Sequence, residues 1–133
     1  MIDRFEKYLS VQRSALNART YRQELLASNI ANADTPHFKA RDIDFKSALQ
    51  GALAGSSSGI NMKLTSPRHL EGQKEPQYGG ALRYRTEYQS AVDGNTVDMD
   101  IERSAFVENS THMSASLTFI KDMLKEMATA IQP

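Results

Sequence analysis

Three histidines are the side chains in this sequence best suited to acid–base or metal chemistry, because the chain contains no cysteine. His37, His69 and His112 lie far apart along the chain, and none has the spacing that metal ligands use. Without cysteine there is neither a thiolate nucleophile nor a disulfide framework. We therefore expect no metal site and no cofactor.

Two other groups of polar residues raise the possibility of an enzyme or a nucleic-acid binder. His37 with Asp34 or Asp42 would suit a small hydrolase, but the sequence offers no plausible nucleophile. The run 83–88 (RYRTEY) interleaves arginine with tyrosine, as single-strand binders do. On a strand these two residue types face opposite sides, and the chain has no net charge, so we expect a half-buried strand with an exposed basic face. We expect no catalytic residue, no nucleic acid and no small-molecule substrate.

The composition allows one domain with a thin hydrophobic core. The chain has 133 residues, and its 16 basic side chains balance 16 acidic ones. Leu, Ile, Val and Phe make up about one-fifth of the residues, close to the range of disordered chains. The start, 1–7 (MIDRFEK), is too charged for the apolar region of a signal peptide, so we expect any export to occur without a cleaved leader.

The segment 5–30 predicts a long amphipathic helix that neither proline nor glycine interrupts. Alternate steps of four and three residues follow the seam of a helix packed on other helices, and they reach the apolar residues Phe5, Leu9, Leu16, Leu26 and Ile30. Pro36 keeps Thr35 out of the helical region, and Asn32 tolerates the conformation that closes helices. The helix should therefore end between Asn32 and Thr35.

The segment 98–131 predicts a second and more regular helix. Asp98, Asp100 and Glu102 place negative charge at its start, which the helix dipole favours. The same stepping gives an almost unbroken apolar seam of Phe106, Met113, Leu117, Ile120, Leu124, Met127 and Ile131.

The chain thus divides into three segments of a mainly α fold. The N-terminal helix and its Asn/Pro motif occupy 1–36, a small middle segment occupies 37–97, and the C-terminal helix occupies 98–133. The elements expected in the middle are a short helix at 44–53, a flexible Gly/Ser link at 55–59, strands at 60–65 and 82–88, a polar loop at 67–80 between these strands, and a turn at 93–95.

The two long helices are too long for the core that this chain can build. Helices of about 26 and 34 residues extend well past a globule whose radius of gyration is about 14 Å. Residues 1–41 carry a net charge of +3 and residues 98–133 a net charge of −3. We expect the helices to pair within or between chains as a coiled-coil-like arm, and their seams to be covered by other copies or relatives of the chain.

Two stretches resemble a known protein family. Residues 26–45 (LASNIANADTPHFKARDIDF) resemble the N-terminal motif of flagellar rod and hook proteins, in particular of the proximal-rod FlgB family. Residues 93–100 (DGNTVDMD), followed by the long helix, resemble the C-terminal segment of that family. The chain differs at His37, where the family usually has glycine, and at Met113, where it tends to have tyrosine.

The resemblance implies a structural subunit of the bacterial flagellar basal body and no enzyme. Such a subunit passes through the flagellar type III export system and polymerises into the proximal rod, which crosses the periplasm and transmits torque. The implied partners are other copies of the chain, other proximal-rod proteins, the rod-to-ring adaptor and the membrane-embedded ring. The alternative is a soluble helical adaptor or export chaperone that clasps a partner without polymerising.

From the seams and the motif together, we expect an assembly interface on both long helices and on the turn after the first. It comprises Phe5, Leu9, Leu16, Leu26, Asn29, Ile30, Asn32, Thr35, Pro36, Phe106, Met113, Leu117, Ile120, Leu124, Met127 and Ile131.

Overall fold

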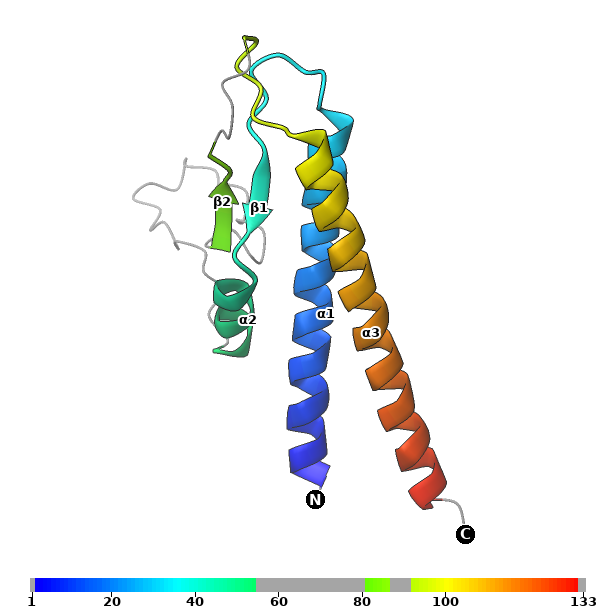
Figure 1. Ribbon diagram of the computed structural model, residues 1–133. Coiled ribbons are helices and arrows are strands. Elements are labelled where there is room, and N and C mark those ends of the chain that lie inside the picture. Colours follow the sequence, from blue (N-terminus) through cyan, green and yellow to red (C-terminus); the bar gives the residue numbers. More distant parts are fainter. Residues whose placement is uncertain (1, 55–80, 87–91, 132–133) are drawn as a thin grey trace, which may run out of the picture.

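A long N-terminal helix, α1 (Ile2–Ala31), forms the axis of the molecule. The computed structural model describes residues 2–54, 81–86 and 92–131 (Figure 1). The other elements in chain order are β1 (Arg41–Ile43), α2 (Phe45–Leu53), β2 (Leu82–Tyr84) and α3 (Met99–Ile131). The described chain is mainly helical, as the sequence predicts.

The turn after α1 is stabilised by its own asparagine. The backbone N–H of Asn32 donates to the carbonyls of Ser28 and Asn29, and its side-chain amide donates to the Ser28 carbonyl at 2.8 Å. The Asn32 side chain thereby adds a second hydrogen bond to the Ser28 carbonyl in the last turn of the helix. The helix ends at Ala31, one residue before the range 32–35 that the sequence predicts.

The C-terminal helix α3 begins with a side-chain cap. The Asp98 carboxylate accepts hydrogen bonds from the backbone N–H groups of Asp100 and Ile101, at 3.0 and 3.3 Å. Since the first N–H groups of a helix have no partner within it, this cap fixes the start of α3 beside Asp98.

The helices α1 and α3 run antiparallel and side by side, so both chain ends lie at the same end of the molecule (Figure 1). At 1.5 Å per residue, the helices are about 45 and 50 Å long. On its other side α1 contacts β1 and α2 (Figure 1). The predicted pairing of the two arms is therefore present within one chain.

The two short strands form an antiparallel pair in which Asp42 is opposite Arg83. The sequence predicts a strand over 82–88, of which only Leu82–Tyr84 is a strand among the described residues, and it does not predict β1. The short helix α2 confirms the expected one, and the Asp44 carboxylate caps it by accepting from the N–H groups of Lys46 and Ser47.

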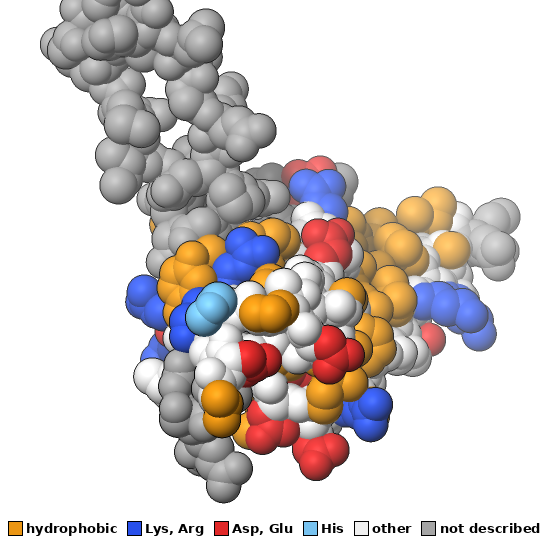
Figure 2. Space-filling view, turned by 90° about the horizontal axis from the view of Figure 1, so that it is seen from above, with side chains coloured by type: hydrophobic (Ala, Val, Ile, Leu, Met, Phe, Trp, Pro, Cys, Tyr) orange, Lys and Arg blue, Asp and Glu red, His pale blue; other side chains and the backbone are white. Residues whose placement is uncertain are grey.

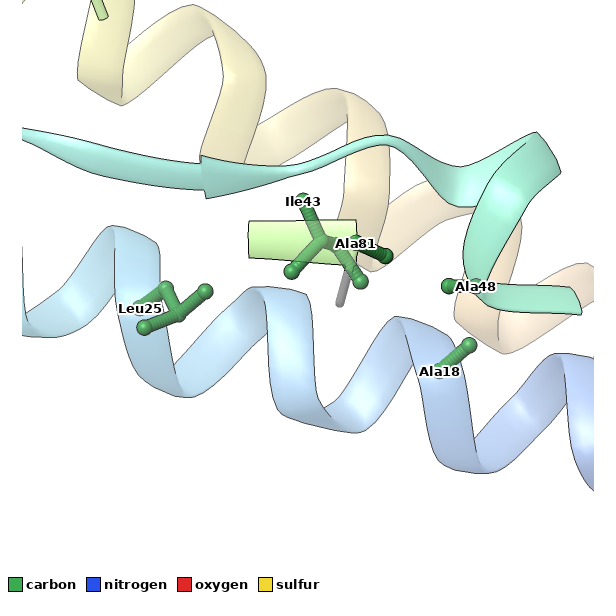
Figure 3. Close-up of a cluster of buried hydrophobic side chains, with 5 residues drawn as sticks. All are labelled: Ala18, Leu25, Ile43, Ala48 and Ala81. Carbon is green, nitrogen blue, oxygen red and sulfur yellow. The ribbon is translucent and has the colours of Figure 1, made fainter. Parts of the chain in front are cut away.

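The hydrophobic core is small and lies between α1, α2 and the strand pair (Figure 3). Its buried members are Ala18, Leu25, Ile43, Ala48 and Ala81. Three of these five side chains are single methyl groups, so the core agrees with the low content of large apolar residues. The expected link at 55–59, strand at 60–65, loop at 67–80 and end of the second strand at 87–88 lie outside the described residues.

Candidate functional site

The two sequence motifs meet at the end of the molecule where α1 ends and α3 begins, which we call the junction (residues 32–40 and 92–98). Asn95 is 5% exposed and lies at its centre. Its side-chain amide donates to the carbonyls of Ala33 at 2.7 Å, Thr35 at 2.9 Å and Asn32 at 3.1 Å. One side chain from the second motif thus binds the turn built by the first motif.

Backbone hydrogen bonds join the same two segments. The N–H of His37 donates to the Asp93 carbonyl, and the N–H of Thr96 donates to the Phe38 carbonyl, both at 3.0 Å. The Thr96 hydroxyl oxygen accepts from the N–H of Ala40 at 2.8 Å. The junction therefore fixes the direction in which the chain leaves α1 and enters α3.

His37 and Gly94 both have left-handed backbone conformations in this junction. Their φ angles are 59° and 71°. Glycine adopts this conformation readily, whereas a residue with a Cβ does so at a cost. A Cβ atom at position 94 would lie 2.9 Å from Nδ1 of His37, so Gly94 is needed for both its conformation and its size.

The predicted turn residues lie at the surface of the junction. The Thr35 hydroxyl donates to the Asn32 side-chain oxygen at 3.1 Å, and Pro36 is exposed. Exposed acidic side chains gather at this end of the molecule (Figure 2), and they are Asp34, Asp93, Asp98 and Asp100.

Below the junction, an ion-pair cluster joins four parts of the fold. Arg22 of α1 donates to both carboxylate oxygens of Asp42 in β1, at 2.9 and 3.0 Å. Arg85, just after β2, donates to Asp42 at 2.7 Å and to Glu102 of α3 at 2.8 Å. Asn29 donates to the other Glu102 oxygen at 3.1 Å and to the Arg41 carbonyl at 2.8 Å. The cluster therefore connects both long helices to the strand pair.

The two carboxylates of this cluster have opposite pKa shifts. Burial raises the pKa of Glu102, and the hydrogen bond from Asn29 and the charge of Arg85 only partly oppose it. Burial also acts to raise the pKa of Asp42, but the hydrogen bonds from Arg22 and Arg85 outweigh it and lower that pKa below 3.8. Asp42 is thus held as a carboxylate, whereas Glu102 is the more easily protonated group.

Two sequence interpretations are corrected by this cluster. Glu102 is 1% exposed and forms an ion pair with Arg85. It is therefore a buried carboxylate that connects α3 to the segment after β2, and not only a negative charge beside the helix dipole. The half-buried strand with an exposed basic face expected on 83–88 is correct for the exposed Arg83 but wrong for the two residues that follow, because Tyr84 is 68% exposed and the Arg85 side chain is 21% exposed. The cluster could not be predicted because its members are distant in sequence.

The contact between α1 and α3 includes buried polar side chains. The buried residues of α3 are Glu102, Ala105, Asn109 and Ser116. The Asn109 amide donates to the Arg19 carbonyl at 2.9 Å and to the Gln23 side-chain oxygen at 2.6 Å. Within the described residues of α3, none after Ser116 is buried, and in 5–17 of α1 none is buried either. We call 5–17 and 117–131 the distal halves of the two helices.

The predicted interface residues fall into three classes of burial within the chain. Leu26 and Asn29 are buried. The half-buried ones are Phe5, Leu9, Leu16, Ile30, Asn32, Phe106, Met113, Ile120 and Met127, and the exposed ones are Thr35, Pro36, Leu117, Leu124 and Ile131. Within the distal halves, the predicted interface residues that remain exposed in a single chain are thus Leu117, Leu124 and Ile131.

Two of the residues first considered for acid–base chemistry make separate contacts in the described part of the chain. Asp42 pairs with Arg22 and Arg85, while His112 lies exposed, 3.9 Å from the Glu108 carboxylate. His69 lies outside the described residues. No cluster of three or more His, Asp or Glu suitable for a metal occurs in 2–54, 81–86 and 92–131.

None of the helices in the described part of the chain is both long and apolar enough to span a membrane.

Comparison with known proteins gives one consistent result. A family model described as "Flagella basal body rod protein" matches residues 9–39. The chain is similar to the flagellar basal body rod protein FlgB of Proteus mirabilis strain HI4320, with 44% identity over 99% of this chain and 98% of the relative. The FlgB proteins of Salmonella typhimurium and Escherichia coli K12 are 44% and 42% identical, with the same coverage.

Proposed function

Because the chain belongs to the FlgB family of flagellar basal body rod proteins, we propose that it is a subunit of the proximal rod and transmits torque across the periplasm. The family is structural, and the chain is not an enzyme. Torque transmission requires stiffness, which long helices packed side by side provide.

The observation that carries this proposal is the exposure of the distal halves. Over 5–17 and 117–131, about 20 Å of each helix, no described residue is buried, although Leu124 and Ile131 are large and apolar. Isolated helices of this length are marginal in water, and their stability normally comes from packing an apolar face. Neighbouring subunits that cover these faces would supply that packing.

In the proposed rod, the predicted interface residues lie on the two long helices and on the turn after α1. The helical segments 1–36 and 98–133 contact neighbouring subunits in an inner layer, and the middle segment 37–97 faces outward. The distal side chains Leu117, Leu124 and Ile131 meet helices of neighbours, whereas Leu26 and Asn29 act within the chain to hold α1 in place.

The proposed partners are other copies of the chain, related proximal-rod proteins, the rod-to-ring adaptor and the membrane-embedded ring. The proposed route to the rod is the flagellar type III export system. Membership in the rod family supports assembly with other rod proteins, and the resemblance of 26–45 to rod and hook proteins supports the shared export route.

The experiment is a deletion of the gene in the organism that encodes the chain, followed by complementation with the wild-type gene. We expect the deletion strain to be non-motile and its purified basal bodies to lack the rod. Complementation should restore both, with the chain present in the basal-body fraction and located in the rod by cryo-electron microscopy. Complete rods in the deletion strain, with the chain found only at the export apparatus in wild-type cells, would instead support the adaptor or chaperone alternative.

A further inference from the structure

The helix α3 has two stripes that could pack on α1. The apolar stripe consists of Phe106, Leu117, Leu124 and Ile131, and the polar stripe consists of Glu102, Ala105, Asn109 and Ser116. At 3.6 residues per turn the two stripes lie roughly 70° apart around the helix. A rotation of α3 about its own axis by this angle would therefore replace one stripe with the other in the contact with α1.

The structure packs the polar stripe on α1. After Ser116 the same side of the helix continues with the half-buried Ile120, Met123 and Met127, whereas Leu117, Leu124 and Ile131 stay exposed. All four residues of the polar stripe are buried, whereas Leu117 is 50% exposed, Leu124 49% and Ile131 75%. The hydrophobic effect is proportional to the apolar area removed from water. Some specific interaction must therefore hold α3 in the observed rotation.

Two fully buried side chains of the polar stripe make such interactions. Asn109 is 0% exposed, and its amide binds the Arg19 carbonyl and the Gln23 side chain of α1. Glu102 lies seven residues earlier and is bound by Asn29 and Arg85. Rolling α3 toward its apolar stripe would break these hydrogen bonds and move both polar groups away from their partners.

The Asn109 contact is not arranged for greatest stability. The side-chain oxygen of Asn109 and Nε of Arg19 are both buried, and neither has a hydrogen-bond partner among the residues that the structure describes. An unsatisfied buried polar atom destabilises the fold. A polar residue kept in a helix seam at a cost in stability is the known way to specify one packing arrangement over others.

We infer that Asn109, together with Glu102, selects the face of α3 that packs on α1 and thereby keeps Leu117, Leu124 and Ile131 of the apolar stripe exposed. Asn109 is thus a specificity-determining residue, and its replacement by an apolar residue releases the rotation of α3. That the exposed stripe then serves neighbouring subunits rests on the proposed function. The selection of the face does not, because it takes place within one chain.

The absence of cysteine from the chain makes a direct test possible, because a single introduced thiol reports on its own burial. Ser116→Cys places the thiol on the polar stripe and Leu117→Cys places it on the apolar stripe. Labelling with a maleimide is measured on the purified full chain, with and without Asn109→Leu. We expect the thiol at position 117 to react about tenfold faster than the thiol at position 116 in the native background, since position 116 must open locally before it reacts. With Asn109→Leu we expect the difference to disappear or reverse.

The stability of the Asn109→Leu variant shows whether Asn109 selects the face of α3 that packs on α1 or only stabilises the fold. The inference requires this variant to keep its helical circular dichroism and to melt at or above the wild-type temperature. An unfolded variant, or a folded one with an unchanged labelling ratio, overturns the inference. Thr111→Leu is the matched control, because it adds the same side chain at an exposed position of the same helix and should leave the ratio unchanged.

The same variant can be followed in cells. We expect Asn109→Leu to lower the number of assembled rods at a normal protein level, because its apolar stripe is now partly covered by its own α1. If the wild-type chain is absent from rods, the proposed function fails, yet the labelling ratio of the isolated chain still tests the choice of face.

Discussion

Leu124→Asp is expected to abolish assembly while leaving the single chain folded. Full burial of a leucine side chain is worth about 1.5–3 kcal/mol. Leu124 is already 49% exposed, so its removal costs the chain about 1 kcal/mol. Inside an assembly the new carboxylate would lose its water without gaining a partner, which costs several kcal/mol for each subunit. The loss should therefore appear in assembly and not in folding.

Leu26→Asp is the matched control, because Leu26 is 0% exposed within the chain. A carboxylate there would be buried in the chain itself, at a cost that approaches the whole stability of a small domain, about 5–15 kcal/mol. The assay compares the steady-state level and the helical circular dichroism of each variant with the number of rods in purified basal bodies. We expect Leu124→Asp to be present at a normal level without rods, and Leu26→Asp to be degraded.

Two results would refute this reasoning. Normal rods in the Leu124→Asp strain would mean that the apolar stripe is not an interface. Loss of the Leu124→Asp protein itself, to the same extent as Leu26→Asp, would mean that the distal half of α3 packs within the chain.

Four further predictions test other parts of the structure. Asn95→Ala removes a side chain that donates to three carbonyls of the junction and accepts from the Val97 N–H, so it should lower the free energy of unfolding by about 2–3 kcal/mol in urea titrations. The control Asn17→Ala changes an exposed residue of α1 and should alter this free energy little. Because the pKa of Asp42 is lowered in the fold, its contribution to stability should be present at neutral pH and be lost as the pH falls below 3.8, and Asp42→Asn should remove that part of the acid dependence. Glu102 has the opposite sign, because its raised pKa makes the fold bind a proton more readily, so its protonation should add stability as the pH falls toward 4.5, and Glu102→Gln should remove this gain. In hydrogen exchange of the isolated chain, 18–31 and 99–116 should be protected and the distal halves should exchange rapidly; equal protection along α3 would contradict the need for neighbours.

The ends of the helices could be predicted because their signals are local. Pro36 with Asn32 marks the end of α1, and Asp44 and Asp98 mark the starts of α2 and α3 through side-chain caps. Each signal acts within a few residues of its position, so it can be recognised without knowledge of the tertiary structure.

The strand β1 and the ion-pair cluster could not be predicted in the same way. β1 has only three residues, Arg41–Ile43, which is too short for an alternating pattern. Its central residue Asp42 is held by Arg22 and Arg85. These partners lie 20 and 43 positions away in the sequence, so no local pattern indicates them.

The face of α3 that packs on α1 could not be predicted from the hydrophobic pattern either. The pattern identifies a seam of seven apolar residues, but Leu117, Leu124 and Ile131 of that seam are exposed, and the structure buries Asn109 and Ser116. A signal for the correct face is present in the spacing, because Glu102, Asn109 and Ser116 recur at intervals of seven. A row of polar residues at intervals of seven indicates the solvent-exposed side of a helix unless the partners of these residues on the other helix are known.

The outer ends of α1 and α3, at Ile2 and Ile131, lie at the same end of the molecule (Figure 1), and this has a practical consequence for imaging the protein in cells. A fluorescent tag fused to either terminus would stand next to the distal halves and obstruct any helix that approaches them. The short helix α2 lies on the other side of α1 from α3 (Figure 1), and the exposed Ala54 follows its last residue. A short epitope inserted directly after Ala54 should therefore mark the subunit and leave both long helices free to pack.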